Sequence, residues 1–183
     1  MSAGPGRPVF LTGMMGAGKS TIAPLLAAAW GVVWVDLDVR VARIFGAGVS
    51  TLFARGEAQF RRCEHLALRL LLAEPGLCAR TIVIATGGGL VLDPANRALM
   101  QAAGHVVLLD APLEVLTARL LVAEQRATRP LLAGSDEDVR ARLAEKLASR
   151  RSAYGEATVV VDASGSPQDA VHRLLSAFSE VHP

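Results

Sequence analysis

Apolar residues follow two patterns along this chain, and the two patterns alternate with each other. Compact apolar runs bounded by turn residues are typical of buried strands, whereas apolar residues spaced three or four apart are typical of helices. The runs predict five strands, at residues 8–12, 32–37, 81–85, 105–109 and 158–161. The helical spacing predicts a helix that ends at residue 30 and further helices at 39–45, 51–54, 57–73, 94–103, 112–122, 136–154 and from 167 onward.

This alternation of strands and helices predicts an α/β fold, with a mainly parallel five-stranded sheet and helices on both faces. A chain of 183 residues corresponds to one domain, because an average domain has roughly 150 residues. We therefore expect an unstructured leader at residues 1–7 and a single domain at residues 8–183. Ligands of such sheets bind at the carboxyl ends of the strands, and three of the motifs described below fall there.

The composition is that of a folded protein, with 51% hydrophobic and 20% charged residues. A formal net charge of +2 gives no argument for nucleic acid or a membrane surface as a partner. No uninterrupted apolar run reaches the roughly 18 residues that a membrane-spanning helix needs. Cys63 and Cys78 lack the spacing of a zinc site, so we expect reduced thiols and a cytoplasmic protein.

The turn after the first predicted strand satisfies the phosphate-loop pattern G-x-x-x-x-G-K-[ST]. Its glycines let successive backbone N–H groups point at phosphate oxygens, and the following helix adds the positive end of its dipole. Lys19 is placed to reach the β- and γ-phosphates of ATP, and Ser20 to offer a hydroxyl to Mg²⁺. A chance glycine turn is the alternative, but the strand before and the helix after fit a phosphate loop. The residues predicted to bind the nucleotide are Gly13, Gly16, Ala17, Gly18, Lys19, Ser20 and Thr21.

A phosphate loop does not identify the phosphate acceptor, and a pair of carboxylates gives the first indication of it. Asp36 and Asp38 flank Leu37 at the end of the second predicted strand. Alternate residues of a strand face the same way, so we expect both carboxylates to point into one cleft. One would hold Mg²⁺ through water, and the other would orient or deprotonate an acceptor hydroxyl. The alternative is that Asp38 caps the helix expected from residue 39.

Glycines and arginines supply the remaining candidates. Gly87, Gly88 and Gly89 follow the third predicted strand and permit the close approach of a ligand, although an ordinary turn also explains them. Arg61, Arg129 and Arg150 would serve as forks for a carboxylate or a phosphate if they converge on the same cleft. The alternative is that each is a solvated charge on a helix surface.

Taken together, six segments resemble the shikimate kinase family: G-M-M-G-A-G-K-S, D-L-D, G-E-A-Q-F-R-R-C-E, T-G-G-G, R-P-L-L and R-R-S-A-Y. Their order and spacing match from about residue 9 to residue 161. The resemblance implies a three-layer P-loop kinase fold with a mobile lid at about residues 123–135. It also implies ATP-dependent phosphorylation of the 3-hydroxyl of shikimate, on the pathway to the aromatic amino acids, by a monomer.

The resemblance assigns a role to each matched residue. Asp38 would bind the acceptor hydroxyls and act as base, and Asp36 would lie near Mg²⁺ with Ser20. Lys19 and Arg129, the latter from the lid, would act on the phosphates as catalytic residues, and Arg119 would flank the adenine. The residues implied to bind shikimate are Asp38, Arg61, Gly87, Gly88, Gly89 and Arg150, of which the two arginines would hold its carboxylate.

One segment departs from the family pattern R-x-P-L-Y, because this chain has Arg150-Arg151-Ser152-Ala153-Tyr154. Either arginine could bind the substrate, and counting four residues back from Tyr154 favours Arg150.

Three other functions compete with a shikimate kinase. A related kinase for a sugar acid or nucleoside monophosphate would share the phosphate loop, but it does not predict these motifs together. A ligand-sensing domain of a transcriptional regulator would have lost acidic residues that are intact here. A nucleotide switch would need a base-reading motif that the sequence lacks. Cys63, Cys78 and His65 are assigned structural roles.

Overall fold

The computed structural model describes residues 4–122 and 135–181. Its strands are β1 (Val9–Thr12), β2 (Trp34–Asp36), β3 (Val83–Ala85), β4 (His105–Asp110) and β5 (Val159–Asp162). Its α-helices are α1 (Lys19–Trp30), α2 (Leu37–Phe45), α3 (Val49–Ala54), α4 (Glu57–Leu72), α5 (Pro94–Ala103), α6 (Leu113–Leu120), α8 (Asp136–Tyr154) and α9 (Pro167–Val181). Two short 3₁₀ helices that the sequence patterns did not predict are η1 (Leu77–Ala79) and η2 (Leu90–Leu92).

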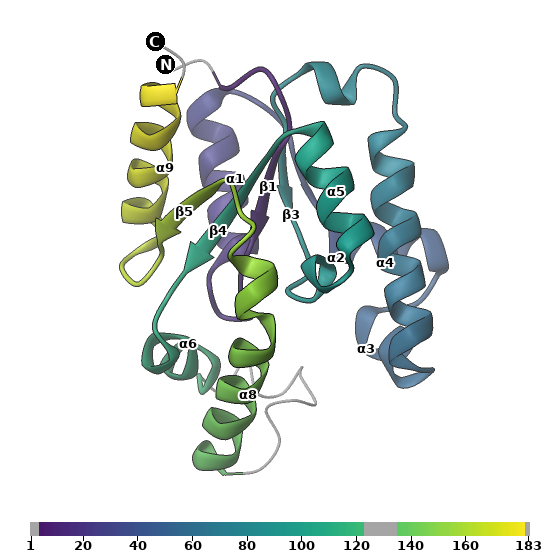
Figure 1. Ribbon diagram of the computed structural model, residues 1–183, viewed down its shortest axis with the longest axis vertical. Helices are drawn as coiled ribbons and strands as arrows, with labels where there is room; N and C mark the ends of the chain where they lie inside the picture. The colour runs from purple at the N-terminus through teal and green to yellow at the C-terminus, as the bar shows by residue number, and fades with distance from the viewer. Residues whose placement is uncertain (1–3, 123–134, 182–183) are drawn as a thin grey trace.

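The five strands form one sheet in the order β2-β3-β1-β4-β5, and every pairing is parallel. Strand β1 lies at the centre, where Leu11 is in register with Ala85 of β3 and Val107 of β4. Helices cover both faces of the sheet (Figure 1). The predicted α/β class is confirmed, and the sheet is wholly rather than mainly parallel.

Successive residues of β1 divide the hydrophobic core into two layers. Val9 and Leu11 pack with residues of α1 and α9 on one face of the sheet. Phe10 packs on the other face, with residues of α2, α4 and α5. All three side chains are fully buried, as expected of a central parallel strand that is covered on both faces. This burial explains why the first apolar run of the sequence predicts its strand so well.

The course of the chain after β1 and β3 creates the place for a ligand. These strands are neighbours, but α1, which follows β1, covers one face of the sheet, and α5, which follows β3, covers the other. The two connections diverge at the carboxyl ends of the strands, and ligands of parallel α/β sheets bind at such points. Helices α6 and α8 extend beyond the same end of the sheet (Figure 1).

The second strand is shorter than expected, and the difference changes the account of its carboxylates. β2 ends at Asp36, and α2 already begins at Leu37. The Asp36 carboxylate caps this helix by accepting hydrogen bonds from the backbone N–H groups of Asp38 and Val39, at 2.9 and 3.2 Å. The strand predicted at 32–37 is therefore too long, and the alternative that Asp38 is the helix cap is wrong.

The start of the chain is described from residue 4. Residues 4–7 form neither helix nor strand. The backbone N–H of Gly6 nevertheless donates to Oγ1 of Thr81 at 2.7 Å, and the Arg7 guanidinium donates to the carbonyl of Ala102. This part of the expected leader lies against the domain, and residues 1–3 lie outside the described part of the chain.

The expected lid at 123–135 lies outside the described residues except for Ser135, which caps α8. Arg129 belongs to this segment. Among the helices that the structure describes, none is both long and apolar enough to cross a membrane.

Gly104 joins α5 to β4 and provides a test of the packing around the central strand. A β-carbon at Gly104 would collide with the carbonyl oxygen of Pro8, which is fixed because it accepts the N–H of His105 at 2.9 Å. We expect Gly104→Ala to lower the free energy of unfolding by about 2–3 kcal/mol, because overpacking here must move backbone.

Urea unfolding measures this loss, and Gly48→Ala is the matched control. A β-carbon at Gly48 would meet no atom within 4 Å; because Gly48 is the N-cap of α3, where alanine is less favourable than glycine, we expect a loss of at most about 1 kcal/mol. Equal losses in the two variants would contradict the packing argument.

Candidate active site

The phosphate loop connects β1 to α1, and its backbone has the conformation that its glycines allow. Gly13, Gly16 and Gly18 have φ angles of 137°, 84° and 92°, in a region that other residues rarely adopt. Gly18 is the N-cap of α1, and no side chain caps this helix. The start of α1 is thus open to a ligand, and helix N-termini favour anions.

Two side chains connect the loop with its surroundings. The Lys19 ammonium donates to the carbonyls of Gly13 and Met14, at 2.8 and 3.0 Å. The Ser20 hydroxyl donates to Oδ2 of Asp36 at 2.8 Å, which joins the loop to the end of β2. A hydroxyl and a carboxylate are the oxygen donors that Mg²⁺ prefers. Within the described part of the chain there is no group of three or more His, Cys, Asp or Glu side chains that could hold a metal.

Gly87 lies against two carboxylates that come from different helices. A β-carbon added at Gly87 would be 2.5 Å from Oε1 of Glu64 and 2.8 Å from Oδ1 of Asp38. Asp38 comes from the first turn of α2, and Glu64 from the middle of α4. Asp36 and Asp38 thus both reach the predicted cleft, but from a helix cap and a helix, not from alternate positions of one strand.

The next two glycines lie against the two arginines. A β-carbon at Gly88 would be 3.3 Å from Nη1 of Arg150 and 3.2 Å from the carbonyl of Gly13, and one at Gly89 would collide with the Arg61 guanidinium. The φ angle of neither glycine is positive. Gly88 and Gly89 are thus explained by the close approach of the arginine side chains and not by an unusual backbone conformation. The tertiary structure brings these two arginines, from α4 and α8, to the same turn.

Arg61 is held by its own helix. Its guanidinium donates to the carboxylates of Glu64 at 2.6 Å and Glu57 at 2.9 Å. It also lies over the rings of Phe60 and Phe53, at 5.4 and 5.9 Å from their centroids, which adds cation–π attraction. These contacts fix the orientation of the guanidinium before any ligand binds.

Glu64 is a site residue to which the sequence analysis assigned no role. Its side chain is 2% exposed. Burial raises the pKa of the Glu64 carboxyl to about 7, although the positive charge of Arg61 opposes this shift. The position of Glu64 three residues after Arg61, on the same face of a helix, was the available signal. Only the fold shows that the Glu64 end of this ion pair is buried against Gly87.

Arg150, and not Arg151, faces the site. Arg150 is 6% exposed and donates to Sδ of Met14 at 3.4 Å, whereas Arg151 is exposed. Tyr154, four residues later on α8, donates its hydroxyl to the carbonyl of Gly88 at 2.9 Å. The helical spacing of four thus places Arg150 and Tyr154 together against the glycine turn.

Arg119 of α6 connects the phosphate loop with the segment after β5. Its guanidinium donates to the carbonyl of Gly16 at 3.2 Å and to those of Ser164 and Gly165 at 3.1 and 2.6 Å. This places Arg119 on the nucleotide side of the molecule. Arg129, the other arginine predicted to act there, lies outside the described residues.

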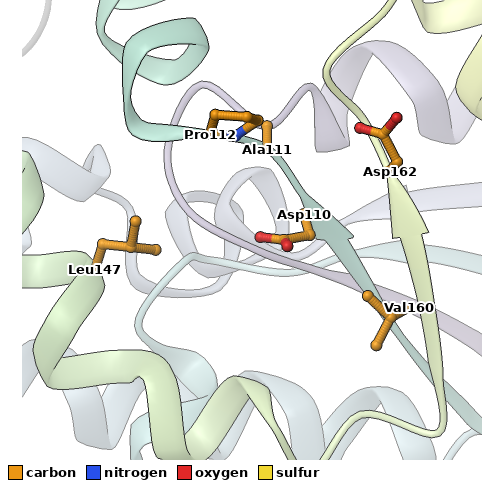
Figure 2. A pocket seen from close by; sticks show the side chains of 6 residues that line it. All are labelled: Asp110, Ala111, Pro112, Leu147, Val160 and Asp162. Atoms are coloured by element: carbon orange, nitrogen blue, oxygen red, sulfur yellow. The ribbon is translucent and has the colours of Figure 1, made fainter.

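A separate pocket of about 410 Å³ lies at the carboxyl ends of β4 and β5. Leu147 of α8 lies across this pocket from Asp110 and Asp162 (Figure 2). None of the residues predicted to bind nucleotide or substrate lines it. The candidate site is therefore the cluster around the phosphate loop and Gly87–Gly89, not this pocket.

Cys63, Cys78 and His65 lie outside the cluster around the glycine turn in their described contacts. Cys63 and Cys78 are free thiols, and Nδ1 of His65 lies 2.7 Å from the amide oxygen of Asn96. The structural roles assigned to these three residues from the sequence remain a prediction.

A phosphate loop that faces a second cluster of arginines and carboxylates defines a P-loop protein with an adjoining site for a small polar molecule. Comparison with known proteins is more specific. The sequence model described as "Shikimate kinase" matches residues 15–179. The shikimate kinase of Gloeobacter violaceus is 44% identical over 175 residues, which cover 95% of this chain and 93% of that protein. The chain belongs to the shikimate kinase family.

Solved structures agree with this assignment. The crystal structure of shikimate kinase from Bacteroides thetaiotaomicron has a TM-score of 0.86 and 32% identity, over 94% of this chain and 98% of its own. Shikimate kinase from Acinetobacter baumannii in complex with shikimate has a TM-score of 0.84 and 29% identity, over 96% of this chain and 94% of its own. The predicted P-loop kinase fold and the stated resemblance are both confirmed.

The raised pKa of Glu64 predicts a dependence of stability on pH. In the folded protein the pKa of the Glu64 carboxyl is about 7, compared with an ordinary pKa of 4.5. The stabilising contribution of the protonated carboxyl is therefore complete below pH 4.5 and is lost as the pH rises through 7. Since a glutamine side chain stays neutral at every pH, we expect the unfolding free energy of Glu64→Gln, relative to wild type, to rise by about 1–3 kcal/mol between pH 5 and pH 8.

Urea unfolding at the two pH values measures this difference. Glu57→Gln is the control, because Glu57 also pairs with Arg61 but its side chain is 59% exposed. We expect its stability relative to wild type to be the same at both pH values. A Glu64→Gln difference that does not change with pH would show that Glu64 is ionised throughout.

Proposed function

We propose that this protein transfers the γ-phosphoryl group of ATP to the 3-hydroxyl of shikimate, giving shikimate 3-phosphate and ADP in the biosynthesis of aromatic amino acids. The observation that carries the proposal is the convergence at Gly87–Gly89 of Asp38, Arg61 and Arg150 beside the phosphate loop. Membership of the shikimate kinase family and the likeness to a relative solved in complex with shikimate support it.

The phosphate end of the site consists of the loop and two oxygen donors. Backbone N–H groups of the loop and the start of α1 bind phosphate oxygens, and Lys19 turns from the carbonyls of Gly13 and Met14 to the transferring phosphoryl group. Ser20 and Asp36 are the residues that would hold Mg²⁺ between them. When bound, this ion would neutralise charge on the β- and γ-phosphates.

The acceptor end is organised by Asp38 and the glycine turn. Asp38 accepts a hydrogen bond from the acceptor hydroxyl, orients it in line with the γ-phosphorus and takes up its proton. Gly87 allows the ring of the substrate to approach this carboxylate, because any side chain there would occupy the same space. Phosphoryl transfer depends mainly on positioning and charge stabilisation, so this alignment supplies much of the catalysis.

The two arginines bind the carboxylate of shikimate from different elements. Arg61 is fixed by Glu57, Glu64 and the aromatic rings on α3 and α4. Arg150 approaches from α8 across Gly88. Guanidinium groups bind carboxylates through paired, charge-assisted hydrogen bonds, so two arginines at a fixed spacing set the position of the distant hydroxyl over Asp38.

The lid is proposed from the sequence. We propose that Arg129 approaches the phosphates when the segment at 123–135 closes, which would keep water from replacing shikimate as acceptor. Arg119, at the carbonyl of Gly16, is proposed to flank the adenine. We further propose a cytoplasmic monomer. The family resemblance supports the monomer, and the free thiols of Cys63 and Cys78 support the cytoplasm.

An ADP-release assay with MgATP tests the function. We expect release that depends on shikimate and that does not occur with gluconate, a nucleoside monophosphate or water. Asp38→Asn should lower kcat by about 10²–10⁴-fold, as loss of a general base does. The control Asp93→Asn keeps the cap of α5 and should retain wild-type turnover. Absence of stimulation by shikimate would overturn the proposal.

A comparison of the two neighbouring arginines tests the substrate site. We expect Arg150→Lys to raise the KM for shikimate by about 10–100-fold, because lysine cannot form the paired hydrogen bonds of a guanidinium. Arg151→Lys should stay within twofold, since Arg151 is exposed. Steady-state kinetics measure both values, and a larger effect at Arg151 would reverse the assignment.

A further inference from the structure

Met14 occupies a position of the phosphate-loop pattern at which any residue is allowed, yet its side chain is buried and contacts a distant part of the chain. It follows the first glycine of the loop and is 2% exposed. Its sulfur lies 3.4 Å from Nη1 of Arg150, a residue 136 positions later in the chain. The phosphate loop and the arginine proposed to bind the substrate carboxylate are therefore in direct side-chain contact.

The surroundings of Arg150 differ from those of Arg61. Arg61 forms ion pairs with two carboxylates of its own helix. Among the described residues, no ion pair within 4.0 Å is found for Arg150; its side-chain hydrogen bonds involve the Met14 sulfur and the Tyr154 hydroxyl, and the charge of Glu64 acts on it only from a longer distance. A buried guanidinium in such surroundings retains most of its attraction for an added anion, because a neutral neighbour does not cancel its charge.

A thioether suits this position for two physical reasons. Its sulfur is only a weak hydrogen-bond acceptor, so it orients the Nη1–H group without competing strongly with a carboxylate. Its unbranched, polarisable chain also fills irregular space against neighbouring groups. A carboxylate at position 14 would neutralise Arg150, and a small side chain would leave the guanidinium without support on the side of the loop.

We propose that Met14 is a positioning residue that holds Arg150 against Gly88, in the orientation that receives the carboxylate of the substrate. The proposal rests on the proposed function, because it concerns affinity for the carboxylate of shikimate. Met14 acts through Arg150 and not on the phosphoryl group. Its loss therefore weakens binding of the charged substrate more than it slows phosphoryl transfer.

The test compares Met14→Ala and Met14→Leu with wild type. We expect Met14→Ala to raise the KM for shikimate about tenfold, a loss of roughly one charge-assisted hydrogen bond, with kcat within threefold. Met14→Leu keeps most of the volume but lacks the sulfur, and we expect a rise of about threefold. The uncharged methyl ester of shikimate, measured as a competitive inhibitor, should bind all three proteins within twofold.

Met100→Ala is the matched control. Met100 is fully buried in the core on the face of the sheet that α5 covers. Its replacement should lower the thermal midpoint as Met14→Ala does but leave the KM for shikimate unchanged. A rise in KM of equal size in Met100→Ala would mean that loss of packing alone explains the effect.

Two further results would overturn the role of Met14. One is a wild-type KM in both Met14 variants, and the other is an equal loss of affinity for shikimate and for its methyl ester. The proposed function fails separately, because in that case wild-type protein does not phosphorylate shikimate at all.

Discussion

The site depends on the absence of side chains at three successive positions. Each glycine of Gly87–Gly89 lies so close to a charged group that a β-carbon would displace it. Since α2, α4 and α8 contribute those charged groups, the glycine turn is where the packing of three helices meets the end of β3. A methyl group at Gly87 or Gly89 would force the ends of these charged side chains to shift, and one at Gly88 would press on both the Gly13 carbonyl and Arg150.

Two carboxylates of the site, Asp36 and Glu64, are held by defined partners. Asp36 caps α2 and also accepts the Ser20 hydroxyl, so one carboxylate fixes both the start of a helix and the phosphate loop. Glu64 pairs with Arg61 but is so far buried that its pKa is raised. At Glu64 the cost of desolvation outweighs the attraction of Arg61. What the pair supplies is a guanidinium of fixed orientation.

Much of the fold was predictable, because β1, β4 and the amphipathic helices have the periodicity that burial on one or two faces requires. The boundary between β2 and α2 at Asp36 was not predictable from the sequence. Trp34–Asp36 continues directly into α2, and the apolar Leu37 resembles a strand residue until the hydrogen bonds of the cap are seen. The phosphate loop was predictable residue by residue, because its function depends on local backbone conformation.

The sequence by itself determined the class of fold, the phosphate loop and the residue types that we propose for the acceptor site, because these follow from local spacing and from motifs in a fixed order. Only the tertiary structure decided which charged groups meet. It selected Arg150 over Arg151, placed Glu64 beneath Gly87 and brought Met14 to Arg150. Such contacts join residues far apart in the chain, and their distances depend on how helices pack on the sheet, which no local pattern encodes.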